Sequence, residues 1–214
     1  MANVIPASVQ LFLFADQVVP ADSALSAGTT IPFINKKVKT NDLAVYLCAF
    51  AIFNLMENQI VYAEVKKKKI LFFIPSTDVM LHQLSNESIN GNLENLLKNE
   101  IAPEPVALKK IINKALQQDS PWPHKTIIYE VVKDSCQLGF GAQTQAVGGV
   151  KGLLKSFTGN LDFTPDIQKI EPEEVHFKTL LSKWEHFKNT NRELYDELLA
   201  DCKAGINSRT QQND

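Results

Sequence analysis

The chain has 214 residues, of which 44% are hydrophobic and 21% are charged, and its formal net charge is -2. This composition is typical of a globular protein, and it excludes intrinsic disorder and collagen-like structure. A chain of this length can bury a sizeable core without disulfides or a structural metal ion.

The cysteines are few and widely spaced. They are Cys48, Cys136 and Cys202, an odd number with no CxxC pair, so the sequence encodes neither a disulfide framework nor a zinc ribbon. The first residues show no basic region before an apolar run, which argues against a signal peptide. We therefore expect an intracellular, cytoplasmic protein.

Residues 1–40 predict a strand-containing segment with little other regular structure. A strand is expected over residues 9–14, and a second short apolar run follows at residues 31–34. Residues 40–58 then predict a long helix. Its residues 43–56 are apolar all round and too few to span a bilayer, so we expect this helix at the centre of the protein.

A β-hairpin is predicted next, because the apolar runs IVYAEV and ILFFI flank four consecutive lysines. These lysines, Lys66, Lys67, Lys68 and Lys69, are expected at and around the turn, projecting into solvent because like charges repel. Residues 75–78 then predict the start of a short helix that runs to about residue 84.

Two more helices and a second hairpin are predicted in the middle of the chain. The first helix places Leu93, Leu96, Leu97 and Ile101 on one face. Residues 106–118 follow, and their apolar stripe opposite a basic face predicts an amphipathic helix. Residues 126–140 predict a hairpin that turns at residues 133–135. Three short helices followed by a hairpin is the element order of a winged helix.

The C-terminal part begins with a glycine-rich connector over residues 141–171. Six of the nine glycines lie between Gly139 and Gly159, which predicts an irregular segment. Residues 172–205 predict two helices that pair as an antiparallel hairpin, the second starting at a capping box of Thr190 and Glu193, and residues 206–214 predict a frayed tail. The predicted fold is α+β and mainly helical, a single domain over residues 1–205 with a winged-helix-like middle region over residues 41–140.

Two lysine surfaces are the leading candidates for binding. The lysines at residues 66–69, and Lys109, Lys110 and Lys114 on the basic face of the third helix, could bind phosphates or anionic lipid headgroups. If this region bound DNA, Asn113 and Gln117 would be the side chains at the base edges. The absence of arginine from this helix and the negative net charge argue against nucleic acid. A solvated lysine face stays open as the plainer interpretation.

The glycine-rich segment offers a different kind of candidate. Leu153, Leu154 and Phe157 lie beside two lysines and would form a partner-binding or membrane-inserting segment, unless they fold onto the core. Thr144 stands where a dinucleotide fingerprint needs glycine, and no P-loop spacing is present. The four histidines lack metal-ligand spacing and there is no GxSxG elbow, so no cofactor, metal or catalytic residue is predicted.

The order of segments over residues 41–140 resembles the Golgi phosphoprotein 3 family and its bacterial relatives. The resemblance is carried by the apolar helix LAVYLCAFAIFNLMENQIVYAE, the hairpin KKKKILFF, the helix start IPSTDVMLHQL, and the basic helix and second hairpin after them. It implies a mainly helical peripheral protein that binds acidic lipid headgroups. The chain departs from the family in its two arginines, Arg192 and Arg209, which lie outside this region, so no headgroup-binding residue is carried over.

These features predict a non-catalytic binding or adaptor module that acts through its lysine-rich surfaces on a protein partner or an anionic lipid surface. A winged-helix nucleic-acid-binding protein and an enzyme with a site assembled from dispersed residues stay open as alternatives. Salt-dependent binding of duplex DNA would identify the first alternative. A deep pocket lined by acidic residues with shifted pKa values would identify the second alternative.

Overall fold

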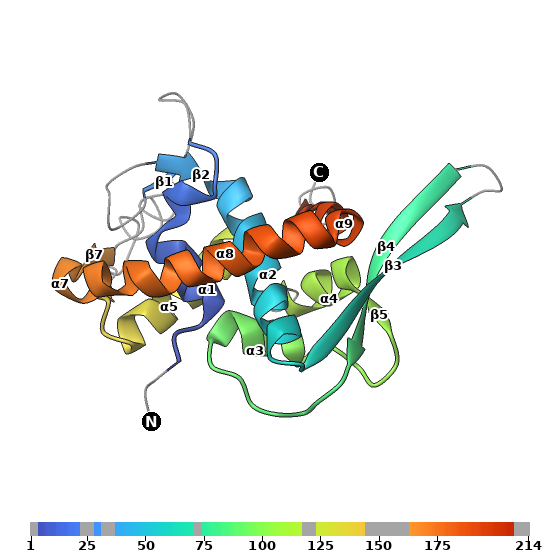
Figure 1. The fold of residues 1–214 in the computed structure, drawn as a ribbon, viewed down its shortest axis with the longest axis horizontal. Helices are drawn as coiled ribbons and strands as arrows, with labels where there is room; N and C mark the ends of the chain where they lie inside the picture. Colours follow the sequence, from blue (N-terminus) through green and yellow to red (C-terminus); the bar gives the residue numbers. More distant parts are fainter. Residues whose placement is uncertain are drawn as a thin grey trace, which may run out of the picture.

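A computed structural model describes residues 4–21, 28–30, 37–70, 74–116, 123–143 and 163–207 of the protein (Figure 1). Helices form the body of the molecule, and a two-stranded β-hairpin projects from one side of it, on the right in Figure 1. The predicted mainly helical α+β fold is confirmed.

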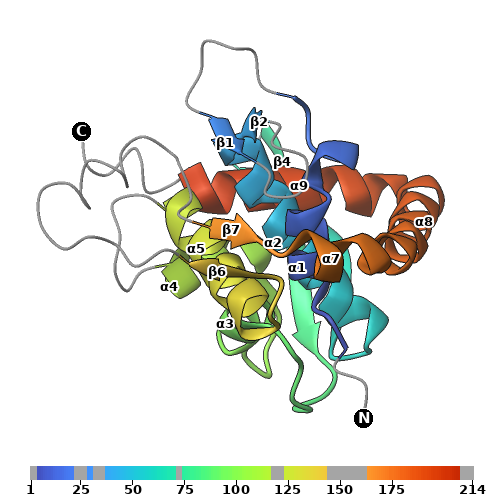
Figure 2. The same ribbon diagram turned by 90° about the vertical axis from the view of Figure 1, so that its left-hand side faces the viewer.

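Helix α2 (Thr40–Glu57) lies in the middle of the body, as the sequence predicts. Its side chains are buried on all sides because α1 (Ala7–Leu13), α3 (Asn92–Lys98), α5 (Pro123–Gln137) and α9 (Arg192–Asn207) pack against it. Figures 1 and 2 show these helices around α2. Within the described residues, no helix combines the length and the apolar character needed to cross a membrane.

The strand predicted at residues 9–14 is wrong, because most of this segment belongs to α1. Every side chain in it except that of Gln10 is buried, so other elements surround the helix. An apolar run that is buried on every side shows no helical period, and its sequence does not distinguish helix from strand. A 3₁₀ helix (Ala15–Gln17) follows, and β1 (Gly28–Thr30) pairs antiparallel with β2 (Lys37–Lys39). The apolar run at residues 31–34 lies outside the described residues.

A hairpin follows α2, as predicted, but its second strand does not lie at the predicted run over residues 70–74, of which residues 71–73 are outside the described part of the chain. Strands β3 (Val61–Ile70) and β4 (Ile74–Gln83) pair antiparallel over their whole length. The lysines at residues 66–69 therefore lie within β3 and not at the turn. A short strand, β5 (Val106–Ala107), pairs with the other edge of β4, which gives a three-stranded sheet in the order β3-β4-β5.

The short helix predicted from residue 75 to residue 84 is wrong, because β4 occupies most of this segment. Val79 and Leu81 are fully buried, whereas His82 and Gln83 at the end of the strand are half-buried. The Pro-Ser-Thr-Asp sequence is a common helix start, but pairing with β3 overrides this local preference.

The second predicted hairpin, over residues 126–140, is wrong because α5 continues to Gln137. The buried aliphatic side chains of α5 have the spacing of one helical face; they are Ile127, Ile128, Val131 and Val132. β-branched residues favour strands, but packing against α1, α2 and α3 overrides the preference. Helices α3 and α4 (Leu108–Ala115) are thus followed by a helix, and the winged-helix order is not found in the described part of the chain.

The C-terminal elements begin with β6 (Gly141–Gln143), which pairs antiparallel with β7 (Phe163–Pro165). The residues between these two strands, 144–162, lie outside the described part of the chain. Helix α7 (Ile167–Ile170) and a 3₁₀ helix (Glu171–Glu173) lead into α8 (Glu174–Thr190). Helix α9 follows, so both helices predicted in residues 172–205 are confirmed.

Helices α8 and α9 meet at a steep corner. Figure 1 shows α8 lengthwise and α9 nearly end-on, and Figure 2 shows the reverse. Thr190 is the last residue of α8, where its hydroxyl donates to the carbonyl of His186 at 2.8 Å, and it does not begin α9 as predicted. The two helices therefore do not pair as the predicted antiparallel hairpin. The corner places the start of α9 beside β3.

Candidate functional site

The two predicted lysine surfaces meet at a buried carboxylate, Asp78 on β4. The Nζ of Lys68 lies 2.8 Å from one oxygen of Asp78, and the Nζ of Lys109 on α4 donates to the other oxygen. Burial would raise the pKa of Asp78, but the hydrogen bonds and charges of Lys109 and Lys68 outweigh it and hold the pKa below its ordinary value. Both lysines are therefore engaged by an internal acid.

Two further predicted lysines form ion pairs at the surface. Lys67 on β3 lies 2.7 Å from Glu193 on α9, and Lys114 on α4 lies 2.5 Å from Glu100. Both lysine side chains are largely exposed, and ion pairs of this kind contribute little to stability. A carboxylate or phosphate from outside can replace Glu193, which is itself exposed, whereas Glu100 is only 18% exposed and would be left as a buried charge without its partner.

The other candidates from the sequence have different placements. Lys66 and Lys110 are exposed and form no ion pair within the part of the chain that the structure describes. Asn113 is half-buried on α4. The remaining candidates lie outside the described residues; they are the side chain of Lys69 and residues Gln117, Leu153, Leu154 and Phe157.

Three acidic residues on one face of α9 hold the hairpin against the body. Glu193 forms its ion pair with β3, and Glu197 accepts a hydrogen bond from the hydroxyl of Thr77 at 2.6 Å. Asp201 accepts a hydrogen bond from the backbone N–H of Val79 at 2.8 Å. Because these acids are four residues apart, they share one face of the helix.

One edge of β3 has no strand partner within the described residues. The N–H of Leu84 donates to the carbonyl of Ile60 at 2.8 Å, which continues the register of β3 and β4. Hydrogen-bonded pairs alternate with open pairs in an antiparallel ladder, so the even-numbered residues of β3 bond to β4. The odd-numbered residues, among them Val61, Ala63 and Val65, direct their N–H and C=O groups away from β4.

Two features of β4 agree with this alternation. Val79 is paired with Val65, and its N–H donates to Asp201 instead of to β3. Pro75 is paired with Lys69, at a position where the ladder to β3 requires no N–H. The edge of β3 therefore has backbone donors and acceptors without strand partners. Val61 and Ala63 are only 2% and 4% exposed, so the edge is covered at these two residues and is accessible from Val65 onward.

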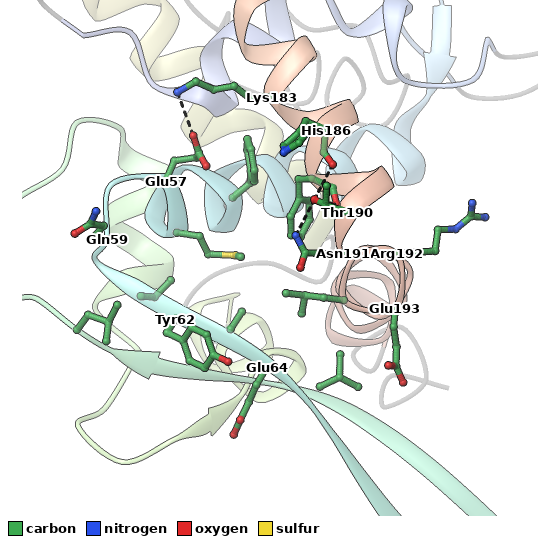
Figure 3. Close-up of a pocket in the computed structure, with 18 of the residues that line it drawn as sticks. Glu57, Gln59, Tyr62, Glu64, Lys183, His186, Thr190, Asn191, Arg192 and Glu193 are labelled. Carbon is green, nitrogen blue, oxygen red and sulfur yellow. Dashed lines mark hydrogen bonds and ion pairs between the residues drawn. The ribbon is translucent and has the colours of Figure 1, made fainter.

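A groove with a volume of about 1160 Å³ runs along this edge (Figure 3). Five consecutive residues of β3, from Val61 to Val65, line it. Side chains alternate between the two faces of a sheet, so consecutive lining residues place the groove at the strand edge and not over one face. The ends of α2 and α8 and the start of α9 form the opposite wall.

The lining of the groove is mixed: about half of its residues are polar or charged, and the apolar ones come from several elements. Phe53 and Met56 come from α2, Phe187 from α8 and Leu194 from α9, and the exposed Leu84 follows β4. Such a lining accepts apolar side chains, whereas the strand edge accepts a polypeptide backbone.

Ion pairs connect the elements at the rim of the groove. Lys183 on α8 lies 3.1 Å from Glu57 at the end of α2, as Figure 3 shows. At the other end, Glu193 on α9 bridges to Lys67 on β3. This ion pair raises the pKa of Lys67, chiefly through the hydrogen bond from its ammonium group to Glu193.

Comparison with family models, curated proteins and solved structures finds no match to this chain. These comparisons do not bear on the resemblance to the Golgi phosphoprotein 3 family, which stays a prediction. The geometry of the described residues is therefore the basis for inferring a function.

The carboxyl groups with raised pKa values lie away from the groove. Glu94 on α3 is fully buried, and burial raises its pKa to about 7 despite the hydrogen bonds that it accepts from Ser8. Burial also raises the pKa of Asp134 and that of Asp201, and each of these accepts a hydrogen bond from a backbone N–H. None of these three acids lines the groove.

Hydrogen exchange tests the open edge of β3 directly. We expect the amides of Val65 and Lys67 to exchange faster than those of Glu64 and Lys66, because only the even-numbered residues donate to β4. The measurement is residue-resolved amide exchange by NMR on the full chain. Equal protection of all four amides would contradict the open edge.

Proposed function

We propose that the protein is a non-catalytic binding module that captures an extended segment of a partner protein on the open edge of β3. The segment adds a strand to the sheet and forms hydrogen bonds with the backbones of Val65 and Lys67, on the accessible part of the edge. The observation that carries this proposal is the groove, because it opens along a strand edge that has no partner within the described residues.

The length of the groove indicates how much of a partner it holds. Val61 to Val65 span roughly 17 Å, at about 3.4 Å for each residue of an antiparallel strand. The partner therefore contributes about five residues to the groove. A segment of this length supplies main-chain hydrogen bonds for affinity and side chains for specificity.

A second copy of this chain is a poorer occupant than a different protein. Lysines on an edge strand commonly prevent pairing between edges, and they favour a different chain here.

The lysine surfaces are less favourable sites than the groove. A phosphate that binds Lys68 or Lys109 would compete with Asp78, whose side chain is only 7% exposed and already contacts both lysines. The carboxyls with raised pKa values lie outside the groove, so no shifted acid points to a catalytic role for it.

The substitution Val65→Pro should weaken binding at the edge of β3 without disturbing the fold. The N–H of Val65 points away from β4, so proline leaves the β3–β4 ladder intact, removes a donor from the edge and places its ring there. Random peptides displayed on phage are selected on the full chain, and the affinities of the recovered peptides are measured by fluorescence anisotropy. We expect Val65→Pro to weaken them by about two- to tenfold, the effect of one lost hydrogen bond.

Two further variants keep this test decisive. Glu64→Pro removes an N–H that bonds to β4, so we expect it to lower the stability of the protein. Met56→Glu places a charge on the groove wall and is expected to abolish peptide binding while leaving the strand edge unchanged. Peptides that bind all variants as tightly as the original chain would overturn the proposal. Binding of anionic vesicles that Val65→Pro leaves unchanged would favour the lysine surfaces instead.

A further inference from the structure

We infer that the segment captured on the edge of β3 carries an acidic residue and, two positions later, a basic residue, and that these pair with Lys66 and Glu64. This inference rests on the proposed function, because it names the side chains that the same edge selects. It concerns only the part of β3 around Val65, where the edge is accessible.

Lys66 is an exposed cation on this part of the strand. Asp78 on β4 is its neighbour in the register of the hairpin, but the two carboxylate oxygens of Asp78 contact Lys68 and Lys109 instead. Lys66 therefore forms no ion pair within the described residues. A carboxylate from outside can pair with Lys66 without displacing an internal partner.

Glu64 is an anion two residues earlier, on the same face of β3. Its neighbour in the register is the apolar Met80, and its Oε1 lies 2.9 Å from the Nε2 of His82. The other carboxylate oxygen forms no hydrogen bond within the part of the chain that the structure describes, and the side chain is 45% exposed. Figure 3 shows this side chain pointing away from α2 and α8. A cation from outside can therefore reach Glu64.

The alternation of the ladder places both side chains opposite the added strand. The N–H and C=O of Val65 point to that strand, so Val65 and the residue facing it form a hydrogen-bonded pair. Lys66 and Glu64 then occupy the non-hydrogen-bonded pairs on either side, where facing side chains are closest. Opposite charges stabilise such facing pairs, and like charges destabilise them.

The order of the two charges follows from the direction of the added strand. Antiparallel pairing is the more stable arrangement, and a strand antiparallel to β3 passes Lys66 before it reaches Glu64. The acidic residue of the bound segment therefore comes first. One residue, which faces Val65, separates it from the basic residue.

The chain itself has this spacing in Glu64, Val65 and Lys66, but a second copy fits the edge poorly. Two copies match these charges only with Val65 facing Val65, which makes Lys67 of each copy face Ala63 of the other. Ala63 is 4% exposed, so the edge is covered there. A shift toward the accessible residues makes lysines face lysines. A short segment of a different protein can end before it reaches Ala63.

The experiment selects displayed random peptides separately on the original chain and on the charge-exchanged variant Glu64→Lys/Lys66→Glu. We expect the original chain to enrich an acidic residue two positions before a basic one, and the variant to enrich the reverse order. Peptides from the first selection should bind the variant about tenfold or more weakly, because like charges then face each other at two positions. The same peptides with their two charges exchanged should recover affinity for the variant.

The matched control is Glu104→Lys/Lys110→Glu, which exchanges two exposed charges outside the groove and should leave the affinities unchanged. An equal loss on this control would overturn the inference, because attraction to the overall charge pattern would then explain binding. Peptides that weaken on Val65→Pro but lack the acidic and basic pair would overturn the inference and leave the proposed function standing. A dimer in sedimentation that Val65→Pro breaks would overturn it in favour of a second copy. Recovery of no binding peptide would overturn both the inference and the proposed function.

Discussion

Replacement of Trp184 by alanine is expected to lower the free energy of unfolding by about 4 kcal/mol. Trp184 on α8 is fully buried, with its ring centroid 4.4 Å from that of Phe50 on α2 and 5.1 Å from that of Tyr195 on α9. The substitution leaves a cavity where three helices meet, and packed helices close such a cavity only in part. The loss is large against a typical total stability of about 5–15 kcal/mol.

Thermal and urea unfolding measure this effect. In a chain of this size, about 4 kcal/mol corresponds to a decrease in Tm of about 10 °C. Val175→Ala on the same helix is the control, because Val175 is 68% exposed and should contribute less than about 0.5 kcal/mol. A loss below about 1 kcal/mol for Trp184→Ala would show that the corner of α2, α8 and α9 is not packed as described.

The same aromatic cluster links the core to the groove. Phe53 and Phe187 both contact Trp184, with ring centroids 5.2 Å and 5.8 Å away, and both line the groove. The residues that form the wall opposite β3 therefore pack directly against the buried core. Trp184→Ala should weaken peptide binding as well as stability, whereas Val175→Ala should change neither.

Helices with one apolar face could be predicted from the sequence. The stripe that contains Ile111 and Ile112 on α4, and the stripe that contains Phe177 and Trp184 on α8, repeat with the period of a helix. The central helix α2 was also predictable, since its apolar run is as long as a helix and longer than a typical strand. In these segments, local pattern and tertiary packing agree.

The wrong predictions share a physical cause. Residues 9–14 are buried on nearly every side, and Ile127, Ile128, Val131 and Val132 are β-branched residues in a helix. In each case, contacts with distant elements decide between helix and strand, and a single sequence does not contain those contacts. For β4, the deciding partner is β3, which stabilises a strand where the local sequence favours a helix start.

The candidate site was predictable only in part. The lysines on β3 and α4 stand out in the sequence as clusters of charge, but their acidic partners do not. Glu193 lies far from Lys67 in the chain, and Glu197 lies 120 residues from Thr77. The groove forms only when the corner of α8 and α9 packs beside β3. The alternation of VYAEV was visible in the sequence, but whether the outer edge of that strand is open depends on the whole fold.

Glu94→Gln is expected to stabilise the protein above about pH 7 and to remove part of the pH dependence of unfolding. The carboxyl of Glu94 is fully buried, and its pKa is raised from 4.5 to about 7, chiefly by burial and to a smaller extent by the nearby charge of Asp134. The unfolded chain therefore loses this proton at a lower pH than the folded chain. The cost of ionisation is absent below about pH 4.5, grows as the pH rises, and is complete above about pH 7.

The size of the effect follows from the difference between the two pKa values, which corresponds to about 3 kcal/mol above pH 7. Glutamine can keep the local hydrogen bonds, because its carbonyl oxygen accepts from the N–H of Ser8 and its amide donates to the Ser8 hydroxyl. Asp134 and Asp201 also have raised pKa values. The original chain and Glu94→Gln both contain these two acids, so their contributions to the pH dependence of unfolding largely cancel.

Urea unfolding at about pH 4.5 and about pH 8 measures the change for the original chain, for Glu94→Gln and for the control Glu87→Gln. Glu87 is exposed, so the control makes the same chemical change without removing a buried charge. We expect the original chain and the control to lose about 3 kcal/mol more than Glu94→Gln between the two pH values. If all three lose the same amount, the Glu94 carboxyl ionises without penalty, and the contact that joins α1 to α3 through Ser8 must then be open to water.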